Sequence, residues 1–514
     1  MRAGLLFQDH DLELDTLPAP DATLVKDLGL ERLYSAMSAG DWYLDTVVRR
    51  VVPSPLRSLE EIRYRQASVA DAMANPDVIR ELYAVAVDAI DAERKVWGAS
   101  IRNPELILDR SAEVIGLFLD AFRALRRIQA ERADAFNSPG FGQFFEHVAS
   151  ELDDAWLAEA DGHVRRLRTR TLHVSARLGT GNRGTGYVLH RRPNLLRGWQ
   201  GRLGIEERRS TVEVLLSDVN GMSMIAEIRA QAIASTAGAV HEADRSLLAF
   251  FVALRAELGF LVACVNLRDA LHAAGAPICM PDPAGTGSGA FAATGLYEPG
   301  LRLAITEPVV GSDVAVDGAG LVVITGANGG GKSTFLRAVG LAHVMLGAGM
   351  FVAAERLSAS IRPGIRTHFT REEDAVLERG KLHEELGRLR EVVDASFPGS
   401  LVLLNETLSS TNEREGAEIA RQVVTALADG GVAVWFVTHN HRLAADLLRD
   451  GRGDIAFLRA GLRDGNERSF RIEAGPPEGT SHGMDLYDRI LGTRRDAQAA
   501  TPGDVARAKR SSSI

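Results

Sequence analysis

The chain has 514 residues, of which 46% are hydrophobic and 25% charged, and its net charge is −9. This is the composition of a globular protein with two to four domains. No run of about 18 uncharged apolar residues occurs, the first residues lack the pattern of a signal peptide, and Cys264 and Cys279 suggest reduced thiols rather than a disulfide framework or a metal site. We therefore expect a cytoplasmic protein that does not span a membrane.

The first half of the chain is predicted to be mainly helical. After an N-terminal segment at 1–26, apolar residues recur at spacings of three and four, with charged residues between them, up to about Asp161. The pattern is clear at Val114, Phe118, Ala121, Leu125 and Ile128. We expect residues 27–295 to form a helical domain with a small β or loop insertion near 164–217.

This insertion is strongly basic. Residues 164–209 contain twelve arginines and two acids, with Tyr187 and Trp199 between them, and short strands are expected at 171–178 and 187–190. Arginine pairs well with phosphate oxygens and aromatic rings can stack on bases, so the segment indicates nucleic-acid binding. The candidate contacts are Arg183, Arg191, Arg192, Arg197 and Arg202. A solvated surface, or pairing with the acidic remainder of the chain, is the alternative.

A long helix is predicted after Met222. Val240, Leu247, Phe251, Leu254, Leu258 and Leu261 form a seam close to a heptad repeat. Because the seam lasts only about three heptads, it favours packing against a helix of the same chain over a free coiled coil. The Pro- and Gly-rich stretch 281–295 is interpreted as a domain boundary, so that 296–492 form the next domain, and 493–514 are expected to be a disordered tail.

A phosphate-binding loop is the most specific motif of the sequence. Residues 326–334 follow the pattern G-x-x-x-x-G-K-[S/T] between a β-branched apolar run at 321–324 and a predicted helix. Its members are Gly326, Ala327, Asn328, Gly329, Gly330, Gly331, Lys332, Ser333 and Thr334. In such loops the backbone N–H groups and the helix N-terminus face a phosphate, the lysine reaches the β and γ oxygens, and the hydroxyl of Ser333 can ligate Mg²⁺. We expect ATP and Mg²⁺ as ligands.

Two further strands are predicted to complete the nucleotide site. The apolar run 400–404 ends in Asn405 and Glu406, which resembles a Walker B strand, and the run 432–437 ends in Thr438 and His439. Glu406 is the candidate base that orients or deprotonates the attacking water, and His439 the candidate sensor of the γ-phosphate. Asn405 stands where an aspartate is usual, so it can contact a metal-bound water but predicts weaker Mg²⁺ binding and slow turnover.

At this point the sequence resembles the MutS family of ATPases. The resemblance rests on GANGGGKST (326–334), LVLLNETLSSTNEREG (401–416), VTHNHRL (437–443), GMFVAAE (349–355) and GTSHGMD (479–485), with a looser match at SLEEIRYRQASV (58–69). It implies an α plus α/β multidomain protein with helical core and lever elements, followed by an ABC-type P-loop ATPase domain. It also implies a dimer with composite nucleotide sites, binding of distorted or branched DNA, and a place for Asp313 near the nucleotide base.

The sequence departs from the family in three ways. Asn405 replaces the Walker B aspartate, Gly380 and Lys381 stand where the family has the serine that completes the partner's site, and the mismatch-reading domain is missing. The basic segment 164–209 falls where the family inserts its DNA clamp, which favours nucleic acid over a merely solvated surface.

Three functions are compatible with parts of this sequence. The leading hypothesis is a cytoplasmic, nucleoid-associated ATPase that forms a dimeric clamp on DNA in mismatch repair or DNA-damage processing, with a repair or recombination protein as a further partner. The alternative is an ATP-binding scaffold with little hydrolysis that recruits a protein partner, which Asn405 and Gly380 favour. A transporter subunit is disfavoured, because the chain lacks an LSGGQ-like signature.

Overall fold

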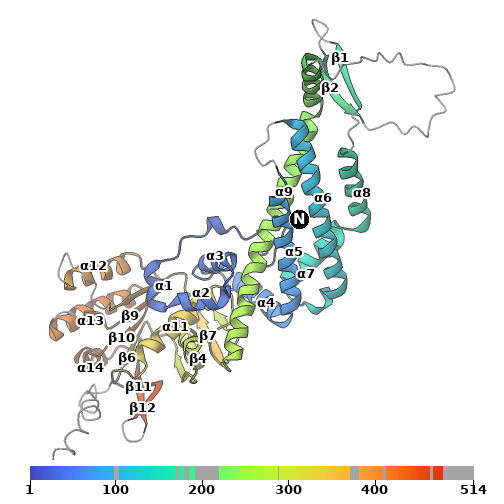
Figure 1. Cartoon of the computed structure of the whole chain (residues 1–514). Coiled ribbons are helices and arrows are strands. Elements are labelled where there is room, and N and C mark those ends of the chain that lie inside the picture. Colours follow the sequence, from blue (N-terminus) through green and yellow to red (C-terminus); the bar gives the residue numbers. More distant parts are fainter. Residues whose placement is uncertain are drawn as a thin grey trace, which may run out of the picture. The chain divides into compact units, whose positions relative to one another are not determined.

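The computed structural model describes residues 1–97, 103–168, 173–178, 184–190, 219–287, 289–370, 381–408, 412–463 and 467–477. The chain forms two compact units (Figure 1). We call Met1–Glu13 with Asn75–Gly259 the helical unit, and Leu14–Ala74 with Phe260–Ile514 the sheet unit. The mixture of helices and α/β sheets agrees with the predicted multidomain α plus α/β class.

The helical unit consists of helices that pack beside one very long helix (Figure 1). Its elements are α5 (Pro76–Lys95), α6 (Pro104–Arg132), η2 (Ala133–Ala135), α7 (Pro139–Glu151), α8 (Asp154–Leu167), β1 (His173–Leu178), β2 (Gly184–His190) and the first part of α9 (Val219–Ala273). The start of α6 is fixed locally, because Asn103 accepts a hydrogen bond from Glu105 N at 2.8 Å and Pro104 occupies the first turn. The two short strands expected in the insertion are present as β1 and β2, and they pair antiparallel.

The predicted seam of α9 packs against a neighbouring helix of the same chain. The rings of Phe118 and Phe251 lie 5.1 Å apart, and Phe122 lies 5.2 Å from Phe251. Leu254 and Leu258 are fully buried. The short heptad pattern therefore serves an intramolecular core.

One segment of α9, Ile233–Ala273, is long and apolar enough to cross a membrane by length and composition, because an 18-residue window within it has a mean hydropathy of 2.1. Of this window, 83% is buried inside the protein. A buried core helix gives the same pattern, and the aromatic contacts of Phe251 are those of a core helix.

The sheet unit begins with four helices and continues into two sheets. The helices are α1 (Ala22–Leu28), α2 (Leu30–Ser38), α3 (Trp42–Val51) and α4 (Leu59–Ala74), after η1 (Leu14–Thr16). The six-stranded sheet has the order β12-β11-β6-β10-β9-β8, and the four-stranded sheet has the order β3-β7-β4-β5. The strands are β3 (Asp282–Ala284), β4 (Phe291–Leu296), β5 (Ser312–Val316), β6 (Leu321–Thr325), β7 (Arg356–Ser360), β8 (Ile365–Phe369), β9 (Leu401–Asn405), β10 (Ala433–Val437), β11 (Ile455–Arg463) and β12 (Glu467–Ala474).

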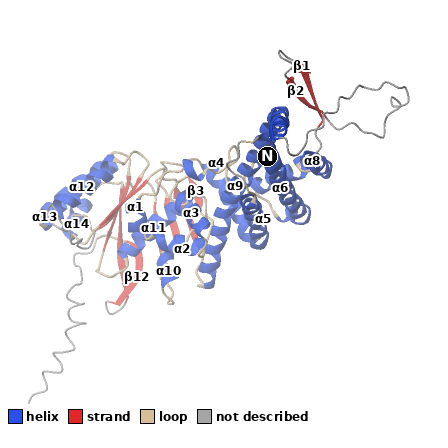
Figure 2. Cartoon of the chain, turned by 45° about the horizontal axis from the view of Figure 1, so that its top comes forward, coloured by secondary structure: helices blue, strands red, loops and turns tan. Residues whose placement is uncertain are grey.

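In the six-stranded sheet, β8, β9, β10, β6 and β11 run parallel and β12 closes the edge antiparallel. The remaining helices of the unit are α10 (Pro299–Ala304), α11 (Lys332–Gly347), α12 (Lys381–Asp394), α13 (Glu413–Asp429) and α14 (His441–Arg449). Alternate residues of β10 face opposite sides: Phe436 joins the core under α12, α13 and α14, while Trp435 approaches Phe335 of α11. Figure 2 shows α12, α13 and α14 together on one side of this sheet and α11 on the other.

The two units divide the chain differently from the predicted domains. The stretch 281–295, expected to be a boundary, contains β3 and most of β4, which pair with β7 of the sheet unit. A Pro- and Gly-rich composition is common at domain boundaries, but here Phe291 and Ala293 are buried in that sheet. Residues 27–74, expected in the helical domain, belong to the sheet unit together with 14–26, because Arg337 donates to the Asp27 carbonyl at 2.9 Å and Arg65 to the Ala348 carbonyl at 3.2 Å.

Candidate nucleotide site

The phosphate-loop motif lies between β6 and α11, as the sequence predicted. Gly326, Gly329 and Gly331 have φ values of +116°, +69° and +92°, a region that side chains rarely adopt. A Cβ atom at Gly326 would lie 2.9 Å from the backbone nitrogen of Ala460 in β11. Any other residue at this position would therefore clash with that strand, in addition to being strained by the positive φ. Gly331 caps α11, which starts at Lys332, so the loop leads directly into a helix N-terminus.

Lys332 is buried inside the loop, with 4% of its surface exposed. Its Nζ donates to the carbonyl oxygens of Gly326 at 2.8 Å and Ala327 at 3.0 Å. Burial lowers the pKa of this amine and the positive charge of Arg468 adds to the effect, while the negative charge of Glu406 opposes it. Two neutral carbonyls do not balance an ammonium charge, so the group fits an anionic phosphate as its charge partner.

The structure brings the two predicted metal residues together. Ser333 Oγ donates to Asn405 Oδ1 at 3.0 Å, although 72 positions separate them in the chain. Asn405 ends β9, which lies in the sheet beside β10, and this pairing carries Asn405 to the same edge as the loop after β6. A hydroxyl and an amide oxygen are hard donors of the kind Mg²⁺ accepts, but neither carries a charge.

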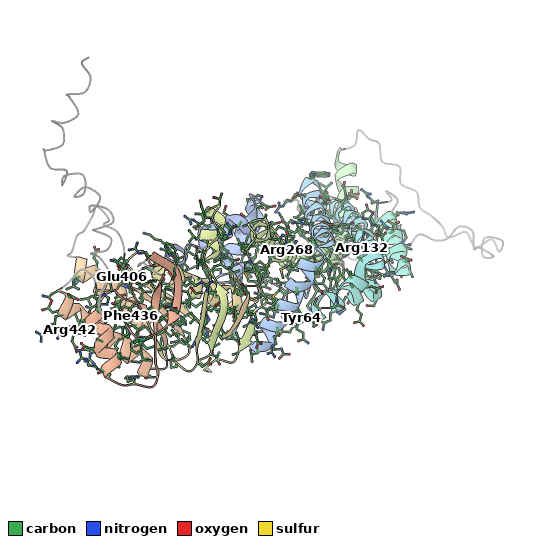
Figure 3. All side chains as sticks on the ribbon, turned by 90° about the horizontal axis from the view of Figure 1, so that it is seen from below. Tyr64, Arg132, Arg268, Glu406, Phe436 and Arg442 are labelled. Atoms are coloured by element: carbon green, nitrogen blue, oxygen red, sulfur yellow. The ribbon has the colours of Figure 1, made fainter. Side chains whose placement is uncertain are left out.

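Glu406 and His439 lie at that same edge. Glu406 N donates to the Val437 carbonyl at 2.9 Å, and its Oε2 lies 3.9 Å from His439 Nδ1. Both side chains are partly exposed, 34% and 47%, so they remain accessible to a ligand. Figure 3 places Glu406 among the side chains of the sheet unit, together with Phe436 of the core, whereas Arg442 lies at the periphery of that unit. The predicted base and the predicted sensor therefore face each other.

The backbone after β9 is unusual, which the sequence did not predict. Glu406 and Leu408 have φ values of +55° and +64° without being glycines. Three side chains hold this segment. Thr370 Oγ1 donates to the carbonyl oxygens of Asn405 and Glu406 at 3.0 and 2.8 Å, and the buried Glu385 accepts a hydrogen bond from Leu408 N at 2.6 Å. His368, also buried, is hydrogen-bonded through Nδ1 to Thr407 Oγ1 at 3.1 Å.

Arg468 of β12 is a second cation beside the loop. Its Nη1 lies 3.1 Å from the position that a Cβ of Gly329 would occupy. It was missed because it belongs to the hairpin β11–β12, far from the motif in sequence, and no local pattern sets this arginine apart from others. The pairing of β11 with β6 is what brings the hairpin to the loop.

A cavity of about 240 Å³ adjoins the loop. Its walls are mostly apolar and include Tyr297, Val309 and Phe470, together with Gly331 and Thr334 of the motif. Apolar and aromatic walls beside a phosphate site suit a flat base. Asp313 does not line this cavity: its carboxylate accepts from Gly295 N at 2.7 Å and lies 3.9 Å from Arg471. The side chain at the cavity is that of Ser312, the preceding residue.

Other predicted residues lie outside the described part of the chain. These are Arg183, Arg191, Arg192, Arg197 and Arg202 of the basic segment, Gly380, residues 409–411, the stretch 479–485 and the tail 493–514. Among the described residues, no group of three or more His, Cys, Asp or Glu side chains could hold a metal ion. The described residues include both cysteines, and both are free thiols.

Comparison with known proteins gives the family. Residues 57–274 match the MutS2 N-terminal domain, and residues 322–451 match MutS domain V. The chain is 32% identical over 262 residues to the endonuclease MutS2 of an Anaeromyxobacter species, which covers 48% of this chain and 31% of that protein. It is 30% identical over 226 residues to the DNA mismatch repair protein MutS of Chloroflexus aurantiacus, covering 39% of this chain and 23% of the relative.

A third relative, the DNA mismatch repair protein MutS of Natronomonas pharaonis, is 34% identical over 206 residues, with 36% of this chain and 24% of the relative covered. The chain thus spans about a quarter to a third of the length of these relatives. With two family domains matched in order, the chain belongs to the MutS family.

Proposed function

We propose that this protein is an ATP-dependent DNA-binding protein, in which ATP binding and hydrolysis drive a dimeric clamp on distorted or branched DNA. The observation that carries the ATPase part is the 3.0 Å hydrogen bond between Ser333 and Asn405, because it joins the phosphate loop to the Walker B-like strand. Lys332, Glu406 and His439 lie at the same edge of the sheet.

Each residue has a defined part in this proposal. The loop amides and Lys332 bind the phosphates, and the cavity lined by Tyr297, Val309 and Phe470 takes the base. Ser333 and Asn405 would hold Mg²⁺, which neutralises phosphate charge when bound. Glu406 orients the attacking water and accepts its proton, and His439, 3.9 Å away, senses the terminal phosphate.

The DNA part of the proposal rests on the sequence of the insertion and on the names of the relatives. The relatives are a DNA mismatch repair protein and an endonuclease. The twelve arginines of residues 164–209 supply the positive charge that phosphate contacts require. A nucleoid-associated, cytoplasmic protein that acts with a repair or recombination partner follows from this function.

One observation favours a second candidate. Asn405 gives the metal site no negative charge, so a protein that binds ATP but hydrolyses little of it, and recruits a protein partner, fits the same geometry. In that case the arginines would contact an acidic protein surface.

Binding of fluorescent linear, mismatched and branched DNA separates the two candidates. The titration covers a series of salt concentrations, with and without ATP and Mg²⁺, for the wild type and for the double variant Arg191→Glu, Arg192→Glu. A clamp predicts affinity that falls steeply with salt, changes with ATP and is lost in the double variant. The charge-matched control is Arg390→Glu, Arg442→Glu, two exposed arginines of the sheet unit. Absence of DNA binding at every salt concentration would reject the clamp in favour of the scaffold.

A further inference from the structure

Arg362 is a buried cation at the end of the six-stranded sheet opposite the candidate nucleotide site. It lies between β7 and β8, and only 7% of its surface is exposed. Its Nη1 donates to the Gly399 carbonyl over a long 3.5 Å, and its Nε is buried without a hydrogen-bond partner. A guanidinium group has five N–H donors, so most of the hydrogen-bonding capacity of Arg362 is unused within the described chain.

No acidic side chain of the described residues forms an ion pair with Arg362. Asp454 is the carboxylate beside Gly320 at the edge of this region, but it is bound by Arg452 at 2.9 and 2.7 Å. The nearby His343 is neutral, because burial, together with the charge of Arg362, lowers its pKa to about 3. Burial also lowers the pKa of Arg362 itself. Buried charges in proteins are normally paired, so we expect the Arg362 guanidinium to bind an anionic partner.

Arg362 lines an open cavity of about 470 Å³, and many of the other lining residues are glycines. Gly287, Gly289 and Gly318 have positive φ values, and a Cβ on Gly289 would lie 2.9 Å from the Cα of Gly318. Because these glycines have no side chains, the backbone can approach closely at Gly289 and Gly318, and the cavity stays unfilled beside them. The polar group that lines it from a buried position is Arg362.

This cavity is separate from the nucleotide site. It is bordered by Gly320, Gly399 and Val432, which precede β6, β9 and β10. At the other end of these strands, the phosphate loop follows β6, Asn405 ends β9 and Thr438 follows β10. The strands are parallel and five residues long, which separates the two ends by about 17 Å.

We propose that Arg362 anchors a second ligand site, which binds a small oxyanion with a phosphate or carboxylate group. The planar fork of arginine matches both groups, and a bound oxyanion would supply the missing counter-charge. The site goes beyond the ATPase and DNA functions and does not depend on either of them.

Thermal unfolding in low-salt buffer tests the site. The probes are inorganic phosphate and acetate, and chloride at equal ionic strength is the reference. A ligand that binds the folded state raises the unfolding temperature in a saturable way. We expect such a rise for the wild type and an apparent Kd at least about tenfold weaker in Arg362→Met. Saturation by phosphate alone identifies a phosphate site, and saturation by acetate identifies a carboxylate site.

Three controls make the outcome decisive. Arg366→Met removes a partly exposed arginine of β8 outside the cavity and should keep the rise. Lys332→Met alters the phosphate loop and should also keep the rise in unfolding temperature. If the rise is lost in Lys332→Met but kept in Arg362→Met, the anion binds at the phosphate loop and the proposal is overturned. Without added anion, Arg362→Met should unfold at or above the wild-type temperature, because it removes an unpaired buried charge. The proposal is also overturned if the wild type shows no saturable rise in unfolding temperature, or if Arg362→Met is strongly destabilised.

Discussion

In the proposed site, Asn405 is expected to determine how strongly a cation is held. Its amide oxygen accepts the hydrogen bond of the Ser333 hydroxyl, so the side chain already points to the proposed metal position. In Asn405→Asp the same geometry gains a negative charge, and we expect half-maximal ATPase activity at about tenfold lower Mg²⁺ concentration, with faster turnover. Phosphate release measured across a Mg²⁺ titration checks this. An unchanged Mg²⁺ dependence would remove Asn405 from the metal site.

Glu406 carries the proposed base function. Glu406→Gln keeps the size and the left-handed backbone of this residue but cannot accept a proton, so turnover should fall by about 10²- to 10⁴-fold while ATP still binds. Steady-state hydrolysis and equilibrium binding of a fluorescent ATP analogue measure the two quantities separately. Glu413→Gln, an exposed glutamate at the start of α13, is the matched control. Turnover that survives Glu406→Gln would place the base elsewhere.

Local sequence patterns predicted single elements well, and contacts between distant elements poorly. The loop, Ser333 and Lys332 were predictable because a strand, a glycine loop and a helix follow one another within a few residues. Asp313 was expected at the base through the family resemblance, but β5 alternates, so Ser312 is buried toward the cavity and Asp313 is exposed. Arg468 and Glu385 reach the site only through strand pairing and helix packing, which no short motif encodes.

The tether between α12 and the segment after β9 gives an element-scale prediction. Glu385→Ala leaves Leu408 N without its buried acceptor, which should cost about 1–3 kcal/mol of stability. Since Leu408 lies two residues after Glu406 and both have positive φ, we also expect kcat to fall more than ATP affinity. Denaturant unfolding and ATPase kinetics measure both effects. The exposed neighbour Glu384→Ala, on the same helix, should change neither.

At the scale of the whole molecule, residues distant in the chain build each unit. The first thirteen residues belong to the helical unit, the next sixty-one to the sheet unit, and Asn75 returns to the helical unit. The sequence suggested contiguous domains, because helical periodicity is the same on both sides of Asn75 and does not reveal which core a helix joins. The hydrogen bonds of Arg65 and Arg337, to residues 283 and 310 positions away in the chain, show which core these helices join.

Glu257 of α9 fastens the beginning of the chain to the helical unit. It is fully buried, and its Oε2 accepts from Leu5 N at 2.6 Å and Leu6 N at 3.2 Å, while Oε1 accepts from Leu12 N at 2.9 Å. Burial raises the pKa of this carboxyl from 4.5 to about 7, an effect larger than the opposite one of the backbone hydrogen bonds, and the charge of Asp11 raises it further.

This raised pKa makes stability fall as pH rises. Between pH 4.5 and about 7 the folded protein holds a proton on Glu257 that the unfolded chain has released, so the contribution is complete below pH 4.5 and is lost by about pH 7. The loss is on the order of 3 kcal/mol. Denaturant unfolding from pH 4.5 to 8 should show a decline that is absent in Glu257→Gln, whose side chain is neutral throughout. The exposed Glu242→Gln on the same helix should keep the wild-type decline. An equal decline in Glu257→Gln would mean that other groups cause it and that Glu257 is ionised in the folded protein.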